Sequence, residues 1–319
     1  MAISQEAKEV IDNYFKAGIK ASLGQPEKFA WKLRYAKLLY RIKYRLPKDQ
    51  LGDNKPVRGK SLHNSVYFTM TPAIRELETG QSKLHVLFMH GGAFMVRPNA
   101  MHWSFCRRLA EDLKCPVSLL AYPLAPAYHH KQTLEAVVDT YRQLISKPGV
   151  ENVIVAGDSA GATLSLLLAQ VLIGTDTKPP SLIVPMSPPL DLASELPRDK
   201  ELESLDPLLP YNGRDFAFRT WIPKAEERTH FPPNALYGPM EGLCPVLLFA
   251  GEREILCGDS VLFAQKARQA GSVVELEVYR DMWHTFPITQ GVPECEQAYQ
   301  RILRAISGEE PLQNKDIYF

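Results

Sequence analysis

Hydrophobic residues gather in short runs from about residue 65 onward, and most runs are followed by a helical pattern of apolar and polar positions. The runs predict strands at residues 65–70, 84–89, 117–122, 153–156, 182–186, 246–250 and 273–279. The helical patterns predict helices at residues 103–113, 134–146, 160–173, 261–270 and 295–305. Apolar strands that alternate with helices predict a mostly parallel sheet covered on both faces, with functional residues after the carboxyl ends of its strands.

Two regions depart from this alternation. Residues 191–233 are rich in proline and charge, and we interpret them as a cap insertion over the functional edge of the sheet; a surface excursion without a role is the alternative. Residues 28–46, which precede Pro47, have apolar and basic positions at helical spacing. They predict a basic cap helix packed on the body, with docking on an anionic membrane as the less favoured reading. We expect an N-terminal cap at residues 1–60 and a catalytic domain at residues 61–319.

Charge is uneven along the chain, although the formal net charge is only +1. Residues 1–60 contain 14 Lys and Arg against 6 Asp and Glu, a net of +8 that the remaining residues offset. The near-neutral total gives no reason to expect nucleic acid as a partner. The five cysteines are odd in number and lack CxxC spacing, so we expect neither a disulfide framework nor a zinc site. Without a signal-peptide pattern or a run of about 18 apolar residues, a cytoplasmic location is expected.

The sequence GDSAG at residues 157–161 joins a predicted strand to a predicted helix. Strand, G-x-S-x-G and helix in succession are typical of a nucleophile elbow, in which a strained turn exposes a serine hydroxyl. The small residues at 157 and 161 let neighbouring elements approach the turn, and the helix N-terminus favours negative charge beside it. Ser159 is therefore the predicted nucleophile. An ordinary glycine-rich turn is the alternative, because the string alone is short.

A second motif, HGGAF at residues 90–94, directly follows the predicted strand at residues 84–89. Successive small residues after a strand allow backbone N–H groups to converge on one point. In acyl transfer that point holds the oxygen of the tetrahedral intermediate, and the N–H of Ala160 would complete this oxyanion hole. We interpret His90 as an organiser of the loop, so the catalytic base must lie elsewhere.

Further motifs follow in order: YPLAP at residues 122–126 and SPPLDL at residues 187–192. With HGGAF, GDSAG and a late acid and histidine, they make the sequence resemble the hormone-sensitive-lipase-like branch of the α/β-hydrolases over about residues 84–290. The resemblance implies an α/β-hydrolase fold with a helical cap. Relatives in this branch often pair through edge elements, so a homodimer is the oligomer that the resemblance suggests.

The resemblance also assigns roles in the oxyanion hole. It implies donors at Gly92, Ala93 and Ala160, with Gly91 shaping the loop. The chain departs from the family at Ala93, where a third glycine is usual. Alanine keeps its backbone N–H, so the hole can survive with tighter access beside it.

A serine nucleophile needs a base that is oriented by a carboxylate, and in this fold the chain order is Ser, then Asp or Glu, then His. Only His230 and His284 follow Ser159. His284 comes directly after the last predicted strand, where it can reach the functional edge, whereas His230 lies in the predicted insertion. His284 is therefore the predicted base.

The acid is predicted in the segment after residues 246–250, which contains both Glu252 and Glu254. The family usually has Asp-Pro-Leu here, and Glu254-Ile255-Leu256 aligns with it, so the resemblance makes Glu254 the equivalent acid. Glu252 is the alternative, since it lies closer to the strand end. We interpret Asp259 as the N-cap of the following helix.

These residues predict a serine carboxylester hydrolase that forms an acyl-enzyme on a small to medium apolar ester. No P-loop, GxGxxG turn or metal-ligand spacing suggests a cofactor. An amidase or lyase on the same site, or a ligand-binding relative without activity, is the alternative. Aromatic residues that could line an apolar pocket are Phe94, Trp103, Phe216, Phe218, Trp221 and Trp283.

Overall fold

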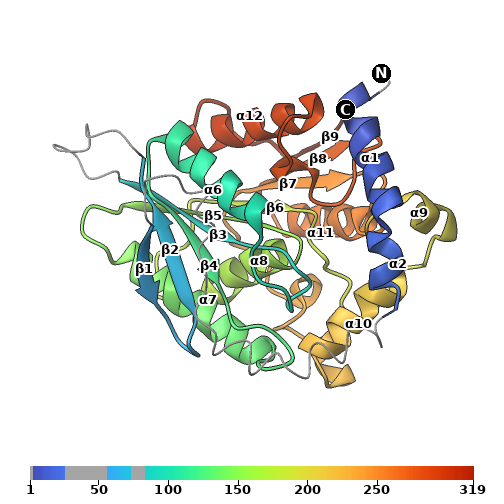
Figure 1. Cartoon of the computed structure of the whole chain (residues 1–319). Coiled ribbons are helices and arrows are strands. Elements are labelled where there is room, and N and C mark those ends of the chain that lie inside the picture. Colours follow the sequence, from blue (N-terminus) through green and yellow to red (C-terminus); the bar gives the residue numbers. More distant parts are fainter. Residues whose placement is uncertain (1–2, 26–55, 73–82) are drawn as a thin grey trace.

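The structure, a computed structural model, describes residues 3–25, 56–72 and 83–319 of the chain. Its described strands form one sheet in the order β1-β2-β4-β3-β5-β6-β7-β8-β9 (Figure 1). Their bounds are β1 Val57–Lys60, β2 Val66–Met70, β3 Leu84–Met89, β4 Val117–Ala121, β5 Asn152–Asp158, β6 Leu182–Met186, β7 Val246–Gly251, β8 Val274–Tyr279 and β9 Lys315–Tyr318. β2 pairs antiparallel with β1 and β4, and all other neighbours are parallel. This confirms the predicted mostly parallel sheet.

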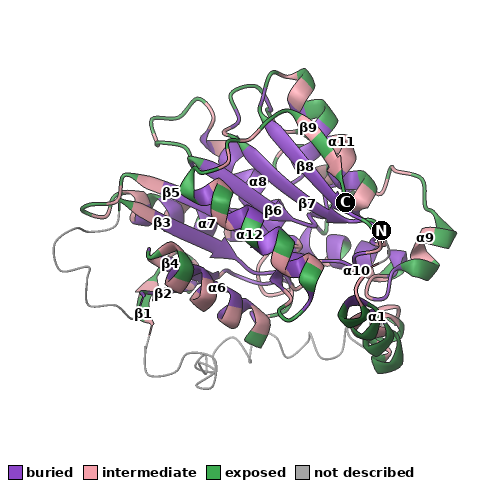
Figure 2. Ribbon diagram, turned by 90° about the horizontal axis from the view of Figure 1, so that it is seen from above, coloured by how far each residue is buried: buried purple, intermediate pink, exposed green. Residues whose placement is uncertain are grey.

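Helices cover both faces of the sheet because successive strand residues point to opposite sides. On one face, apolar side chains pack against α1 (Gln5–Ala17), α6 (Ala100–Leu113) and α12 (Pro293–Ser307). On the other face, apolar side chains pack against α7 (His130–Ile145), α8 (Ala160–Leu172), α10 (Tyr211–Trp221) and α11 (Cys257–Gln269). The central strands are buried on both faces (Figure 2), which explains their continuous apolar runs.

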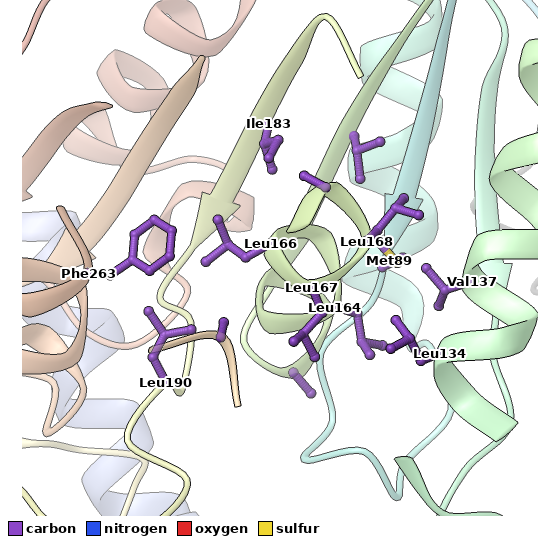
Figure 3. Packing of buried hydrophobic residues seen from close by; sticks show 14 of the residues in the cluster. Met89, Leu134, Val137, Leu164, Leu166, Leu167, Leu168, Ile183, Leu190 and Phe263 are labelled. Carbon is purple, nitrogen blue, oxygen red and sulfur yellow. The ribbon is translucent and has the colours of Figure 1, made fainter. Parts of the chain in front are cut away.

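The helix that follows the candidate nucleophile, α8, is apolar on all sides. Its leucines contact residues of the sheet, of α7 and of α11 (Figure 3). Leu164, Leu166, Leu167 and Leu168 are all fully buried. A helix that is hydrophobic all round belongs in the interior, so the start of α8 is held rigidly by its packing.

The chain between β6 and β7 contains α9 (Lys200–Leu205), α10 and two 3₁₀ turns, Ala225–Thr229 and Ala235–Tyr237. It includes the predicted insertion at residues 191–233. The N-terminal α1 and the short α2 (Ile19–Leu23) lie next to α9 and α10 (Figure 1). None of the described helices is long and apolar enough to span a membrane.

Seven predicted strands correspond to β2–β8 within two residues, and the five predicted helices are present within four residues at each end. Several elements have no counterpart in the sequence predictions: α1, α2, α9, α10, β1 and β9. β1 precedes residue 61, the predicted start of the catalytic domain, yet it pairs with β2. The predicted basic helix at residues 28–46 lies outside the described residues, and the division into cap and catalytic domain stays a prediction.

The topology brings two loops together at one edge of the sheet. From β3 the chain crosses to β4 on one side, while β5 lies on the other side of β3. Ligands of parallel sheets bind at such a reversal of strand order, beyond the carboxyl ends of the strands. HGGAF lies in the loop that follows β3, and GDSAG spans the end of β5 and the start of α8, so both motifs meet there.

Candidate active site

Ser159 sits in the turn between β5 and α8 with a backbone conformation of φ 49° and ψ −122°. This region is costly for any residue with a Cβ, typically by about 1–3 kcal/mol. Surrounding backbone holds the turn in place, because the Ser159 N–H donates to the Met186 carbonyl at 2.8 Å and its carbonyl accepts from the Ala162 N–H at 2.9 Å. The turn has the strained backbone that a nucleophile elbow requires, and the role of Ser159 as nucleophile stays a prediction.

The two glycines of the GDSAG motif are needed for close approach. A Cβ on Gly161 would lie 1.9 Å from the Met89 carbonyl oxygen at the end of β3. A Cβ on Gly157 would lie 2.6 Å from the Gly161 carbonyl carbon. Both distances are well inside van der Waals contact, so only glycine lets β3, β5 and α8 meet around the serine.

A continuous hydrogen-bonded chain runs from Ser159 through His284 to Glu254. Ser159 Oγ lies 2.9 Å from His284 Nε2, and His284 Nδ1 lies 2.6 Å from Glu254 Oε2. Glu254 is fully buried and its other oxygen accepts the Gly251 N–H at 2.9 Å. A neutral imidazole that donates from Nδ1 to the carboxylate presents Nε2 as an acceptor to the serine hydroxyl. The structure thus brings these three predicted residues together.

The alternative site residues lie elsewhere. Glu252 is exposed and accepts the Asp281 N–H at 3.1 Å. His230 is also exposed, and its Nδ1 lies 2.6 Å from the Glu226 carbonyl. Within the described residues, neither is hydrogen-bonded to Ser159 or His284. The prediction for Asp259 is wrong: α11 begins at Cys257, and the Asp259 carboxylate accepts the N–H groups of Leu190 and Asp191 at 2.7 and 2.9 Å.

The loops that present the acid and the base are linked directly. Arg253 donates two hydrogen bonds to Asp281 Oδ1, at 3.0 and 2.8 Å. The Thr285 N–H, next to His284, donates to Ser187 Oγ at 3.0 Å. Sequence analysis did not single out these residues, although Ser187 opens the SPPLDL motif. Together they fix the backbone on both sides of the imidazole.

Charge at the site favours a protonated imidazole. Burial disfavours the cation, but Glu254 and the nearby carboxylates of Asp206 and Asp158 outweigh it and raise the pKa of His284. Burial also raises the pKa of Glu254, and its hydrogen bond to His284 offsets only part of that rise. The carboxylate therefore stabilises the imidazolium that forms when His284 accepts a proton.

The backbone of the HGGAF loop turns sharply. Gly92, Ala93 and Phe94 all have positive φ, of 118°, 54° and 61°. For Ala93 this is the left-handed region, which explains why glycine suits the position in the related family. The Gly91 N–H donates to Asp158 Oδ1 at 2.8 Å, so Gly91 shapes the loop and its N–H is occupied. 

Within the described chain, the N–H groups of Gly92, Ala93 and Ala160 donate no hydrogen bond. Ala160 is the first residue of α8, and the first N–H groups of a helix have no acceptor within it. These three groups are the ones predicted for the oxyanion hole.

Buried histidines hold this loop. His90 donates from Nδ1 to the Gly91 carbonyl at 2.6 Å and stacks on Tyr122, with ring centroids 4.3 Å apart. Burial lowers the pKa of His90 to about 3, so the ring is neutral. His102 accepts the Asn99 N–H at 2.9 Å and faces Asp158 at 3.3 Å. Burial opposes ionisation of Asp158, but His102 and the Gly91 N–H prevail and lower its pKa.

The predicted pocket aromatics separate into two groups. Phe94 and Trp221 stack with ring centroids 3.8 Å apart, beside the HGGAF loop, and Phe218 belongs to the same cluster. Trp103 and Trp283 pack in the cluster on the opposite face of the sheet, so they are core residues. Phe216 is half-buried. No cluster of three metal-ligating side chains occurs among the residues that the structure describes.

Comparison with known proteins fits this geometry. A model of the alpha/beta hydrolase fold family matches residues 86–288. The chain belongs to this family. An esterase of Acinetobacter venetianus is 30% identical to this α/β-hydrolase over 227 residues, which cover 70% of this chain and 75% of that protein. The carboxylesterase/phospholipase LipF of Mycobacterium tuberculosis is 33% identical over 226 residues, which cover 68% of this chain and 60% of LipF.

Among solved structures, a hormone-sensitive lipase from a metagenome library superposes with a TM-score of 0.76 at 22% identity, covering 97% of this α/β-hydrolase and 100% of that chain. At this identity the likeness supports the fold. The family model confirms the predicted α/β-hydrolase fold and family. The esterase relatives support the predicted enzyme class, a carboxylester hydrolase.

Proposed function

We propose that this α/β-hydrolase cleaves small to medium apolar carboxylic esters with Ser159 as nucleophile, His284 as general base and Glu254 as the orienting acid. The observation that carries the proposal is the hydrogen-bonded chain of these three side chains at the carboxyl edge of the sheet. It is supported by the unoccupied N–H groups beside Ser159 and by the esterase relatives. An intact set of hydrogen bonds between these three side chains also argues against a ligand-binding protein without activity.

The mechanism has two halves. His284 takes the proton of Ser159 as its oxygen attacks the ester carbonyl carbon, and the oxyanion of the tetrahedral intermediate accepts hydrogen bonds from the N–H groups of Gly92, Ala93 and Ala160. The alcohol leaves with the proton from His284, which leaves an acyl group on Ser159. Water then attacks the acyl-enzyme with His284 as base, and the carboxylic acid and free Ser159 are regenerated.

Substrate selection is the direct test of this proposal. The purified protein is assayed with a panel of p-nitrophenyl esters of increasing acyl length and with the matched anilides. We expect turnover of short and medium esters, with anilides much slower, and labelling of Ser159 by a fluorophosphonate probe located by mass spectrometry. Preferential cleavage of the anilides would favour an amidase, and a folded protein that the probe does not label would contradict the serine mechanism.

The pH dependence follows from the raised pKa of His284. An imidazole whose pKa lies above its usual 6.5 stays protonated to a higher pH, and the protonated ring cannot accept the Ser159 proton. We expect kcat/KM to fall on the acid side with a midpoint above pH 6.5. Initial rates at constant ionic strength between about pH 5 and pH 9 measure this, and a midpoint below 6.5 would contradict the stated charge balance.

A further inference from the structure

A carboxylate from the segment between β6 and β7 reaches the loop that presents Glu254. Asp206 follows α9 and is fully buried. Its Oδ2 accepts the N–H of Ile255, the residue after Glu254, at 3.0 Å. Its Oδ1 accepts the N–H groups of Leu208 and Leu209 at 2.8 and 2.9 Å. All three partners are donors, which favours the ionised carboxylate.

Apolar packing independently joins the same two segments. Ile255 and Leu256 form a small buried cluster with Tyr211 from α10, and Leu202 and Leu209 pack against it. The cluster is separate from the two that cover the faces of the sheet. The loop after Glu254 is therefore packed against the insertion, while Glu252 and Arg253, before it, are hydrogen-bonded to β8 and to the base loop.

The N-terminal helices extend this connection. Lys20 of α2 donates to the carbonyl oxygens of Glu203 and Asp206, at the C-terminal end of α9, where positive charge is favourable. The Glu203 side chain accepts the Tyr211 N–H at 2.8 Å. Asn212 of α10 donates to the Gly24 carbonyl at 2.8 Å. The turn at Asp206 is thus fixed from α2, α9 and α10 together.

Charge at His284 comes from three separate segments. Glu254 bonds it from the loop after β7, and the charges of Asp158 at the end of β5 and of Asp206 in the insertion add to this effect, so that all three carboxylates favour the imidazolium. His284 in turn favours the ionised form of Asp206, whose pKa burial raises. Lys20 contacts the Asp206 backbone carbonyl.

We propose that Asp206 is a positioning residue for ester hydrolysis: its carboxylate fixes the Glu254–Ile255 peptide and, as a buried negative charge, stabilises the imidazolium of His284. The inference rests on the proposed function. It gives the insertion a part in the chemistry, because the orientation of the acid depends on a side chain that the hydrolase sheet itself does not supply.

The test compares Asp206→Asn and Asp206→Ser with Asp199→Asn. Asp199 caps the other end of α9 through the N–H groups of Glu201 and Leu202, but it is exposed and, among the residues described, has no hydrogen bond to the acid loop. Both Asp206 variants are expected to lower kcat by about tenfold to a hundredfold with little change in KM. Loss of the buried charge also lowers the pKa of His284, so the acid limb of kcat/KM moves to lower pH. Asp199→Asn should match the wild type in both respects.

Wild-type hydrolysis and fluorophosphonate labelling are measured first, so failure of the proposed function is recognised before any variant is compared. In an active enzyme, an Asp206 variant with wild-type kcat and acid limb would overturn the inference. A fall in kcat with an unmoved acid limb would also overturn it, because packing alone explains that result. Serine at position 206 can still cap the turn, so failure of both variants to fold would assign Asp206 a structural role only.

Discussion

Replacement of Ser159 by alanine is expected to lower kcat for a p-nitrophenyl ester by about a millionfold, the scale of loss on removal of a serine nucleophile elsewhere. The change removes one oxygen from a side chain whose backbone is fixed by Met186 and Ala162, so folding should be little affected. The variant should still hydrolyse the ester about 10³–10⁴-fold faster than the uncatalysed reaction in water, because the oxyanion hole and substrate binding remain. Steady-state kinetics and thermal unfolding measure the two effects.

Ser165 provides the matched control. It is a second buried serine in α8, and its hydroxyl donates to the Gly161 carbonyl at 2.9 Å without contact to His284. Ser165→Ala should keep kcat within a few-fold of wild type. A Ser159→Ala protein with full activity would remove Ser159 as the nucleophile, whereas equal losses in both variants would point to a general disturbance of α8.

Replacement of Glu254 by glutamine is expected to lower kcat by about 10⁴, as for the equivalent change in other triads. The amide has nearly the same shape, but it carries no charge and presents an N–H₂ group that competes with the Nδ1–H of His284. The imidazole then loses both its preferred tautomer and the stabilisation of its cation. The measurement is kcat as a function of pH. A thermal unfolding curve of the same variant shows whether any loss of activity comes from a loss of folding.

Glu252→Gln separates the two candidate acids. Glu252 is exposed and bonds the backbone of Asp281, so its amide variant should retain activity within a few-fold. If Glu252→Gln were the damaging change and Glu254→Gln were harmless, the assignment of the acid would be reversed.

Sequence patterns were sufficient to predict the features that depend on residues close together in the sequence. The strands β3 and β6 are continuous apolar runs, and their predicted ends agree with the structure. β1 and β9 were missed because each has four residues, largely exposed or half-buried, at an edge of the sheet. Such short strands form no apolar run, and their pairing partners decide their conformation.

Spacing along the chain alone does not reveal roles that depend on distant partners. Asp259 has the sequence context of an N-cap, but its carboxylate accepts hydrogen bonds from N–H groups that lie 68 and 69 positions away in the chain. Asp206 stands 49 positions from Ile255, within a charged and proline-rich segment that has no period. The choice between Glu252 and Glu254 likewise depends on how the loop after β7 turns toward His284, which spacing along the chain does not specify.

The left-handed backbone at Ser159 also links reactivity to folding. The conformation is unfavourable in isolation, and it persists because Met186 of β6, Met89 of β3 and the start of α8 surround it. These elements meet only once the sheet has assembled, and the partner His284 arrives from 125 positions later in the chain. An unfolded or newly synthesised chain is therefore expected to have an ordinary, unreactive serine, and titration with an active-site reagent should count only the correctly folded molecules.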